Sequence, residues 1–284
     1  MRTGSASGFQ VAFLIYATWL LVVPASHAMS KLLALDAAGN VLLDRYVGVV
    51  VAASGLLAIP PLRRSSVAAL RRPIAPDDRG EVAVAALLNP VHAFAWAGAW
   101  ILWWHFAEGP LGLAQHVEAL GSHQAAMAAT LQPASLSLHL LIAVLLGPIV
   151  EELVFRRFLF DAWTRDFGWF AGMILSSAVF GSLHPNFLPS FLASILLTCV
   201  YRRTGSLRAS IVVHAAGNLL ALYPLLGRWV FPRDLDAPGD LTSWLPQVTA
   251  LAAVVVIWPV YVWMCRERRD APIVLEGDHA ALPR

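Results

Sequence analysis

The stretch that decides the fold is residues 136–163, which read LSLHLLIAVLLGPIVEELVFRRFLFDAW. A bilayer is crossed by about 20 predominantly apolar residues, and this stretch is long enough. It nevertheless carries Glu151, Glu152, Arg156 and Arg157 among aliphatic and aromatic neighbours. Each ionisable residue at bilayer depth costs roughly 2.5–3.5 kcal/mol on insertion scales, so such residues are rare and usually functional. The stretch therefore predicts a membrane-crossing helix that also holds a functional site.

The rest of the chain has the composition of a membrane protein. Of its 284 residues, 58% are hydrophobic and 13% are charged, against about 45–50% and about 25% in soluble domains. Mean hydropathy is +0.65. The 20 Lys and Arg nearly balance the 18 Asp and Glu, so no basic excess argues for a nucleic-acid partner. Cys199 and Cys265 lie in or beside apolar stretches and are expected as buried free thiols.

Apolar runs of similar length recur along the chain and predict an all-α fold, a polytopic transmembrane helical bundle of about eight spans. The expected spans are residues 9–23, 46–62, 82–106, 136–163, 169–183, 187–201, 207–226 and 248–264. Lys and Arg collect on the cytoplasmic side of short connections, and an inside N-terminus places 16 of the 20 basic residues there. Both termini are therefore expected in the cytoplasm, in a multi-pass integral membrane protein.

Two segments have alternative interpretations. The N-terminus, with Arg2, an apolar run and small residues at 25–28, also resembles a signal peptide, and its cleavage would leave seven spans. Residues 109–135 have apolar side chains near helical spacing, which fits either a helix on the outer membrane surface or an irregular loop. The polar tail, residues 266–284, is expected to be a disordered cytoplasmic end.

The charged residues of the fourth span have different expected environments. Pro148 precedes the acids and is expected to kink the helix. Glu152 and Arg156 stand at i and i+4 on one face, which favours an ion pair. Glu151 lies about 100° around the helix, free to face a cavity as a candidate general base. The alternative is that both acids only bond to arginines and polar groups of other helices.

Later spans add a histidine and a histidine–asparagine pair. His184 ends the fifth span, where an interfacial histidine bonded to backbone or water is the ordinary alternative. His214 and Asn218 lie one turn apart, where they can donate two hydrogen bonds to an oxyanion or bond between helices. A rise of about 1.5 Å per residue brings these groups to the depth of Glu151 only if the fourth helix continues to Arg165.

Three motifs follow one another across 68 residues: Glu-Glu-x-x-x-Arg at 151–156, Phe-x-x-x-His at 180–184 and His-x-x-x-Asn at 214–218. In this order on hydrophobic helices they resemble the CAAX protease and bacteriocin-processing family, also called the Abi family, which includes the Ras-converting CAAX endopeptidases. The resemblance implies a catalytic helical core at 131–265. It names no motif in the helices and outer loop of residues 1–130.

The resemblance implies a hydrolase, a glutamate-dependent intramembrane endopeptidase acting on a membrane-anchored polypeptide of CAAX type or of a sorting or maturation pathway, with the lipid bilayer around it. The catalytic residues would be Glu151 and His184, which activate water, and His214 and Asn218, which stabilise the oxyanion. The supporting residues would be Glu152, Arg156 and Phe180.

A metal is not required by the resemblance, although Glu151, His184 and His214 could hold zinc with an open position for water, as a metalloendopeptidase would. We favour metal-free chemistry because no HExxH pair occurs and a metal-bound Glu151 would leave only Glu152 as a nearby base. The alternative from another class is a non-proteolytic immunity or scaffold protein of the same fold. A transporter is disfavoured because no inverted repeat with a second broken helix is found.

Overall fold

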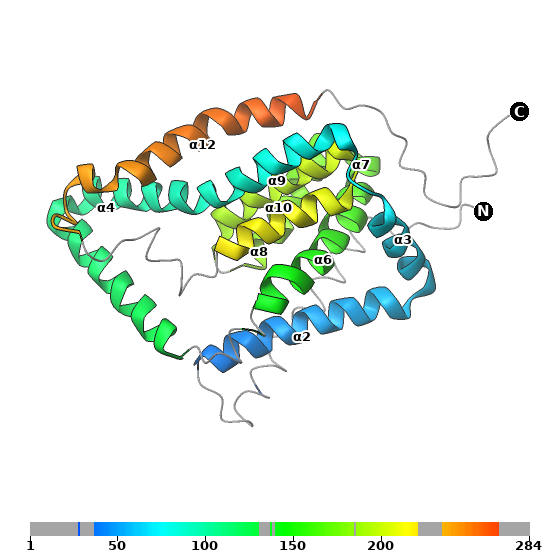
Figure 1. Ribbon diagram of the computed structural model, residues 1–284, viewed down its shortest axis with the longest axis horizontal. Helices are drawn as coiled ribbons and strands as arrows, with labels where there is room; N and C mark the ends of the chain where they lie inside the picture. Colours follow the sequence, from blue (N-terminus) through cyan, green and yellow to red (C-terminus); the bar gives the residue numbers. More distant parts are fainter. Residues whose placement is uncertain are drawn as a thin grey trace, which may run out of the picture.

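The computed structural model describes residues 28, 37–130, 137, 140–184, 186–220 and 235–266, and each regular element in these ranges is a helix. This agrees with the all-α prediction. The first expected span, the signal-peptide alternative and the tail beyond residue 266 lie outside the described residues. Figure 1 shows that most helices run along the longest axis of the molecule.

The N-terminal part of the described chain contains α2 (Ala37–Ala58), α3 (Pro60–Arg71), the 3₁₀ turn η1 (Pro76–Asp78) and α4 (Arg79–Thr130). The second expected span corresponds to α2 and ends at Ala58, because the chain starts a new helix after Ile59. Pro60 opens α3, where its missing N–H costs nothing, since the first amides of a helix have no intrahelical partner.

The helix α4 consists of two arms that meet at a sharp kink (Figure 1). The kink lies at Gly109, whose φ of 75° only glycine adopts readily, and Pro110 follows it. The first arm covers the third expected span. The second arm is helical to Thr130, so a helix is the correct alternative for this part of residues 109–135. Its position relative to a membrane surface stays a prediction.

The described part of the stretch around residues 136–163 forms one continuous helical path, in which π-helical and α-helical segments alternate. The π-helical segments η2 (Leu141–Leu146) and η3 (Leu153–Phe160) flank the α-helical α6 (Gly147–Glu152), and α7 (Asp161–Phe167) follows. Pro148 lies in the first turn of α6, so the break expected there is a change from π to α winding. The path continues past Arg165, as the depth argument required.

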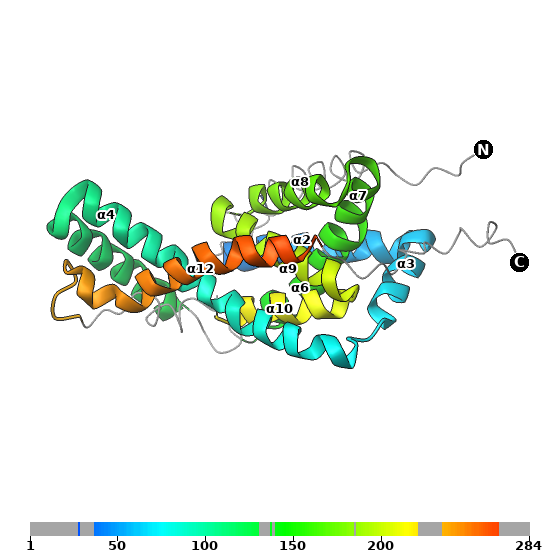
Figure 2. The same cartoon turned by 90° about the horizontal axis from the view of Figure 1, so that it is seen from above.

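The remaining helices follow the expected spans. They are α8 (Trp169–Ser182), α9 (Phe187–Thr204), α10 (Leu207–Leu220) and, after the 3₁₀ turn η4 (Leu241–Trp244), α12 (Leu245–Met264). Figure 2 shows α9 between α8 and α10, while α12 packs along α4. Both thiols, Cys199 and Cys265, are buried and free, as predicted.

Among the residues that the structure describes, two helical stretches are long and apolar enough to cross a membrane by length and composition: Pro76–Ser122 and Leu241–Met264. The eight-span topology and the cytoplasmic termini are not established by this finding. They stay predictions.

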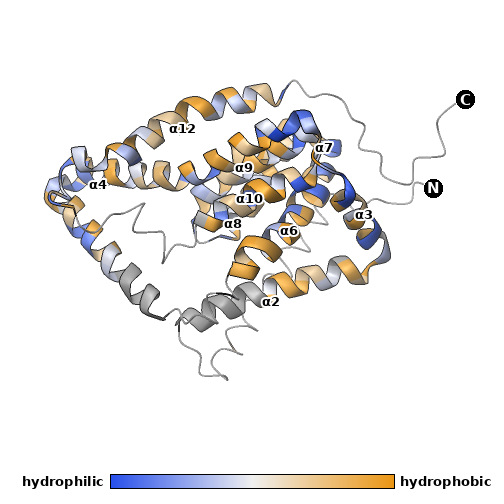
Figure 3. Cartoon of the chain, in the orientation of Figure 1, coloured by the Kyte–Doolittle hydropathy of each residue, from blue (hydrophilic) through white to orange (hydrophobic). Residues whose placement is uncertain are grey.

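Arginines gather at one end of the bundle, where several helices begin or end. At the end of α9, Arg203 binds Glu81 of α4 at 2.9 Å through Nη2, and Arg202 donates to the Cys265 carbonyl at 2.9 Å. At the start of α10, Arg208 donates to the Leu70 carbonyl of α3. Figure 3 shows hydrophilic colour concentrated at this end, around α3 and α7. These arginines therefore share one side of the bundle, as the orientation argument requires.

Candidate active site

The centre of the candidate site is Glu152, a completely buried carboxylate with two partners. Its Oε2 lies 3.0 Å from Nε of Arg156, as the i, i+4 spacing predicted. Its Oε1 accepts a 2.8 Å hydrogen bond from Nδ1 of His214, on α10. Arg156 is equally buried and donates from Nη2 to the hydroxyl of Ser194 on α9 at 3.1 Å. Glu152 and Arg156 thus connect the helical path formed by η2, α6, η3 and α7 to both α9 and α10.

The neighbouring acid, Glu151, has a different environment. Its side chain is 29% exposed, and its Oε2 lies 3.6 Å from Nε2 of His214. That oxygen is buried and makes no hydrogen bond within the described ranges of the chain. The two acids therefore differ in environment: Glu152 is completely buried and paired, whereas Glu151 is partly exposed and has one oxygen without a hydrogen-bond partner among the described residues. That Glu151 faces a water-containing cavity stays a prediction.

The protonation pattern of His214 follows from its partners. A carboxylate can only accept, so Nδ1 carries the proton that is donated to Glu152. The opposite nitrogen, Nε2, faces Glu151. Buried charges are tolerated only when they are paired, and Arg156, at 3.0 Å from Glu152, supplies that pairing for the buried carboxylate.

Phe180 contacts both histidines of the site and Arg156. Its ring is buried and stacks on His184 at a centroid distance of 4.3 Å, while His214 meets its edge at 5.9 Å. The Arg156 guanidinium lies over the same ring at 5.0 Å. One aromatic ring thus lies against two histidines and an arginine. The supporting role expected for Phe180 stays a prediction.

His184 follows directly after α8 and its C-cap Leu183, with one ring nitrogen engaged. Nδ1 donates to the Phe180 carbonyl at 2.7 Å, because a carbonyl can only accept. In the neutral ring Nε2 therefore keeps its lone pair. Within the described residues, no hydrogen bond or ion pair joins His184 to Glu151. Their joint action on a water molecule stays a prediction.

Asn218 lies one turn beyond His214 on α10, and its side chain also contacts the helical path that carries Glu151 and Glu152. Its Nδ2 donates to the carbonyl of Ala143, in η2, at 2.7 Å. The amide has a second hydrogen on that nitrogen, which is the one that could serve an oxyanion. The expected sharing of one helical face by His214 and Asn218 is consistent with their common partner element.

The set expected for zinc does not fit a metal as it stands. Across the described ranges, no group of three His, Cys, Asp or Glu side chains is close enough to hold a metal ion. Glu151 and His214 approach each other, and the second nitrogen of His214 is occupied by Glu152.

Sequence reasoning missed a positioning residue on α4. Asn89 is buried and donates from Nδ2 to the Val213 carbonyl at 2.8 Å. Its amide packs against Gly217, where any side chain would collide with it. Asn89 thereby holds the turn of α10 that carries His214 and Asn218. The only sequence signal was an asparagine followed by Pro90 within an apolar run.

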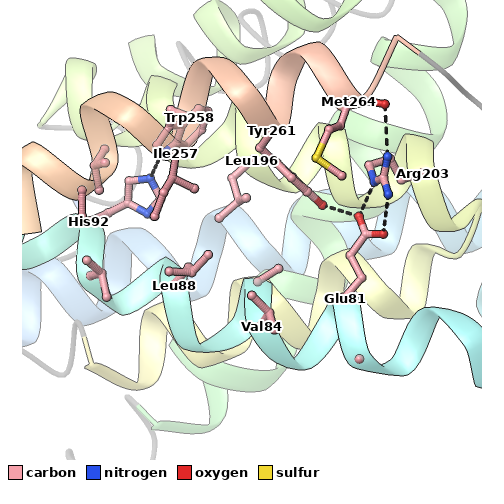
Figure 4. A pocket seen from close by; sticks show the side chains of 15 residues that line it. Glu81, Val84, Leu88, His92, Leu196, Arg203, Ile257, Trp258, Tyr261 and Met264 are labelled. Carbon is pink, nitrogen blue, oxygen red and sulfur yellow. Dashed lines mark hydrogen bonds and ion pairs between the residues drawn. The ribbon is translucent and has the colours of Figure 1, made fainter.

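A hollow lies between α4 and α12, and none of the candidate site residues lines it. It occupies about 370 Å³ between α4 and α12 (Figure 4). At one end Arg203 binds Glu81, and the Tyr261 hydroxyl donates a 2.7 Å hydrogen bond to the same carboxylate. At the other end Trp258 donates to His92. Because its polar groups are paired with each other, the hollow offers mainly hydrocarbon surface.

Comparisons with known proteins cover the region of the site. Residues 133–220, which include all three motifs, match the family described as type II CAAX prenyl endopeptidase Rce1-like. The chain is also similar to UPF0177 protein YbdJ of Lactococcus lactis subsp. lactis (strain IL1403), with 31% identity over 99 residues, or 33% of this chain and 42% of that protein. The chain thus spans less than half the length of that relative. No solved structure matches it significantly. The resemblance predicted from the motifs is confirmed.

Proposed function

We propose that this chain, which is similar to the Rce1-like type II CAAX endopeptidases over residues 133–220, is a glutamate-dependent intramembrane endopeptidase. Its substrate is a membrane-anchored polypeptide, of CAAX type or of a sorting or maturation pathway. The protein spans the bacterial inner membrane about eight times, with the arginine-rich end of the bundle in the cytoplasm, because Lys and Arg collect there.

The observation that carries this proposal is the position of His214 between two carboxylates of different kinds. Glu152 fixes the ring through Nδ1 at 2.8 Å, and the opposite nitrogen lies 3.6 Å from the Oε2 of Glu151. A carboxylate beside an oriented donor is the minimum needed to activate water and to stabilise a developing negative charge. The fully paired Glu152 is unsuited to the role of base, so we assign that role to Glu151.

The proposed reaction adds one water molecule across one peptide bond. Glu151 takes a proton from water while the lone pair on Nε2 of His184 orients the same molecule, and the oxygen bonds to the carbonyl carbon. The resulting oxyanion accepts hydrogen bonds from Nε2–H of His214 and from the second Nδ2 hydrogen of Asn218. When the carbon–nitrogen bond breaks, Glu151 returns its proton to the leaving amine. The carboxylate is thereby regenerated.

The test compares the termini of membrane proteins in cells that express wild type, Glu151→Gln or Glu118→Gln in a deletion strain. Glu118 is an exposed acid on the second arm of α4 and serves as the matched control. We expect one set of cleaved termini with wild type and the control, and accumulated precursors with Glu151→Gln. Equal termini in all three strains, together with equal complementation, would instead identify a non-proteolytic immunity or scaffold protein.

A further inference from the structure

The helix α3 has three arginines on one exposed face. Arg63, Arg64 and Arg71, with Val67 and Ala68 between them, line a shallow hollow of about 300 Å³. With about 100° per residue, all five fall within an arc of about 140°, and Arg64 and Arg71 lie roughly 10 Å apart along the axis. The helix contains no acidic residue. This arginine face therefore presents a continuous positive surface.

The charges of the arginine face are available to a ligand. Within the described ranges, none of its three guanidinium groups makes a hydrogen bond or an ion pair, whereas Arg156, Arg157 and Arg203 are all bound to acids of the protein. A guanidinium presents a planar fork of donors that matches phosphate oxygens. Three unpaired forks on one face provide the donors for more than one phosphate oxygen.

The opposite face of α3 is fastened to the bundle, so the direction of the arginine face is fixed. Ser65 accepts a 3.2 Å hydrogen bond from Nε of Arg157, on η3, and Ser66 is buried. The C-terminal end is held by Arg208, which donates to the Leu70 carbonyl. Because α3 is attached near its middle and at its C-terminal end, the arginine face cannot turn inward without breaking these contacts.

The place of α3 in the fold sets the depth of the arginine face. α3 follows α2 after the single residue Ile59 and lies across the ends of the long helices, at the arginine-rich end of the bundle (Figures 1 and 3). In a protein whose long helices cross a bilayer, this is the level of the lipid headgroups. Exposed Val67 between the arginines suits a helix at the boundary of headgroups and acyl chains.

We infer that the arginine face of α3 is a docking surface for the phosphate headgroups of anionic phospholipids in the leaflet at that end of the bundle. Charge complementarity and helix position carry the inference, which rests on the proposed membrane topology but not on peptide hydrolysis. Basic residues near an anionic leaflet each contribute measurably to attraction, and this attraction falls within a Debye length. The surface is therefore expected to select phosphatidylglycerol over phosphatidylcholine.

The experiment measures binding of labelled phosphatidylglycerol and phosphatidylcholine to the full-length protein in mixed micelles. The variant is Arg63→Gln/Arg64→Gln/Arg71→Gln. The matched control, Arg79→Gln/Arg165→Gln/Arg266→Gln, removes three exposed arginines from other helix ends. We expect the first variant to lose affinity for phosphatidylglycerol on the order of fivefold per arginine, while the control keeps wild-type affinity. An equal loss in both variants would mean diffuse attraction and would overturn the inference.

Two further measurements complete the test. Inorganic phosphate added to the wild type should not displace phosphatidylglycerol; displacement would mean a site for free anions instead of a lipid surface. If the triple variant fails to fold, salt dependence of wild-type binding gives the answer, because the Debye length falls from about 10 Å at 0.1 M to about 3 Å at 1 M salt. Unchanged preference for phosphatidylglycerol at 1 M salt would contradict an electrostatic docking surface.

Discussion

Glu152 and His214 are joined by a 2.8 Å hydrogen bond between two side chains 62 residues apart in the sequence, and both are buried. The same carboxylate also pairs with Arg156 at 3.0 Å. Glu152 is therefore a positioning residue for the imidazole as well as the counter-charge of an arginine. The two adjacent glutamates consequently differ in what their replacement should do.

Replacing Glu152 by Gln should mainly affect stability. The amide keeps an oxygen for His214 but leaves Arg156 as a buried cation without its partner at 3.0 Å, and such a loss costs about 3–5 kcal/mol. Glu151→Gln should change stability little, since that side chain is 29% exposed and its Oε2 accepts no hydrogen bond from the described residues. Thermal unfolding of both purified variants in one detergent checks this. Equal melting of the two variants would contradict the division of roles.

Replacing Phe180 by Leu should disturb the positions of both histidines with a smaller loss of stability. The variant removes the ring that stacks on His184 at 4.3 Å and meets His214 at 5.9 Å, and each aromatic contact is worth about 0.5–1.5 kcal/mol. We expect the folded Phe180→Leu variant to cleave more slowly than wild type. The substrate for this assay is one identified by comparing the termini of membrane proteins between strains. Phe106→Leu is the control, because Phe106 is 78% exposed. If Phe180→Leu cleaves as fast as this control, the ring does not position the histidines.

Chelation tests the metal-free chemistry. Because the described residues include no three-ligand group, we expect cleavage by the purified protein to persist after exhaustive treatment with a zinc chelator. The control is a zinc-dependent peptidase in the same detergent, which should lose activity. Activity that disappears and returns only with added zinc would replace the proposed mechanism by a metal-assisted one.

Much of the site was predictable because it depends on short sequence spacing. The i, i+4 pair of Glu152 and Arg156 follows from helix geometry and is present at 3.0 Å. The apolar runs located α8, α9 and α12 closely, whereas α2 begins well before the span expected there. The π-helical winding of η2 and η3 was not predictable, because the same apolar residues suit an α-helix and no glycine or proline lies within either segment. The pairing of His214 with Glu152 was not predictable either, since the spacing of residues along one helix does not indicate which side chain of another helix they contact.

The contribution of α4 to the site leads to the last prediction, on Gly217. A methyl group there would collide with the Asn89 amide that holds Val213, so Gly217→Ala should destabilise the protein by about 1–3 kcal/mol through overpacking and reduce cleavage. Gly55→Ala is the matched control: it lies inside α2 with nothing near its added carbon, and should stabilise by about 0.5–1 kcal/mol because alanine favours a helix.

Melting temperatures of the two alanine variants and of Asn89→Ala/Gly217→Ala separate the causes. If the collision is responsible, shortening Asn89 in the double variant should recover part of the stability that Gly217→Ala loses, since residues in contact do not contribute additively. Recovery would be incomplete, because the Val213 carbonyl loses its 2.8 Å donor. Additive losses in the double variant would show that Asn89 and Gly217 act independently, and the role of α4 in holding this turn of α10 would have to be abandoned.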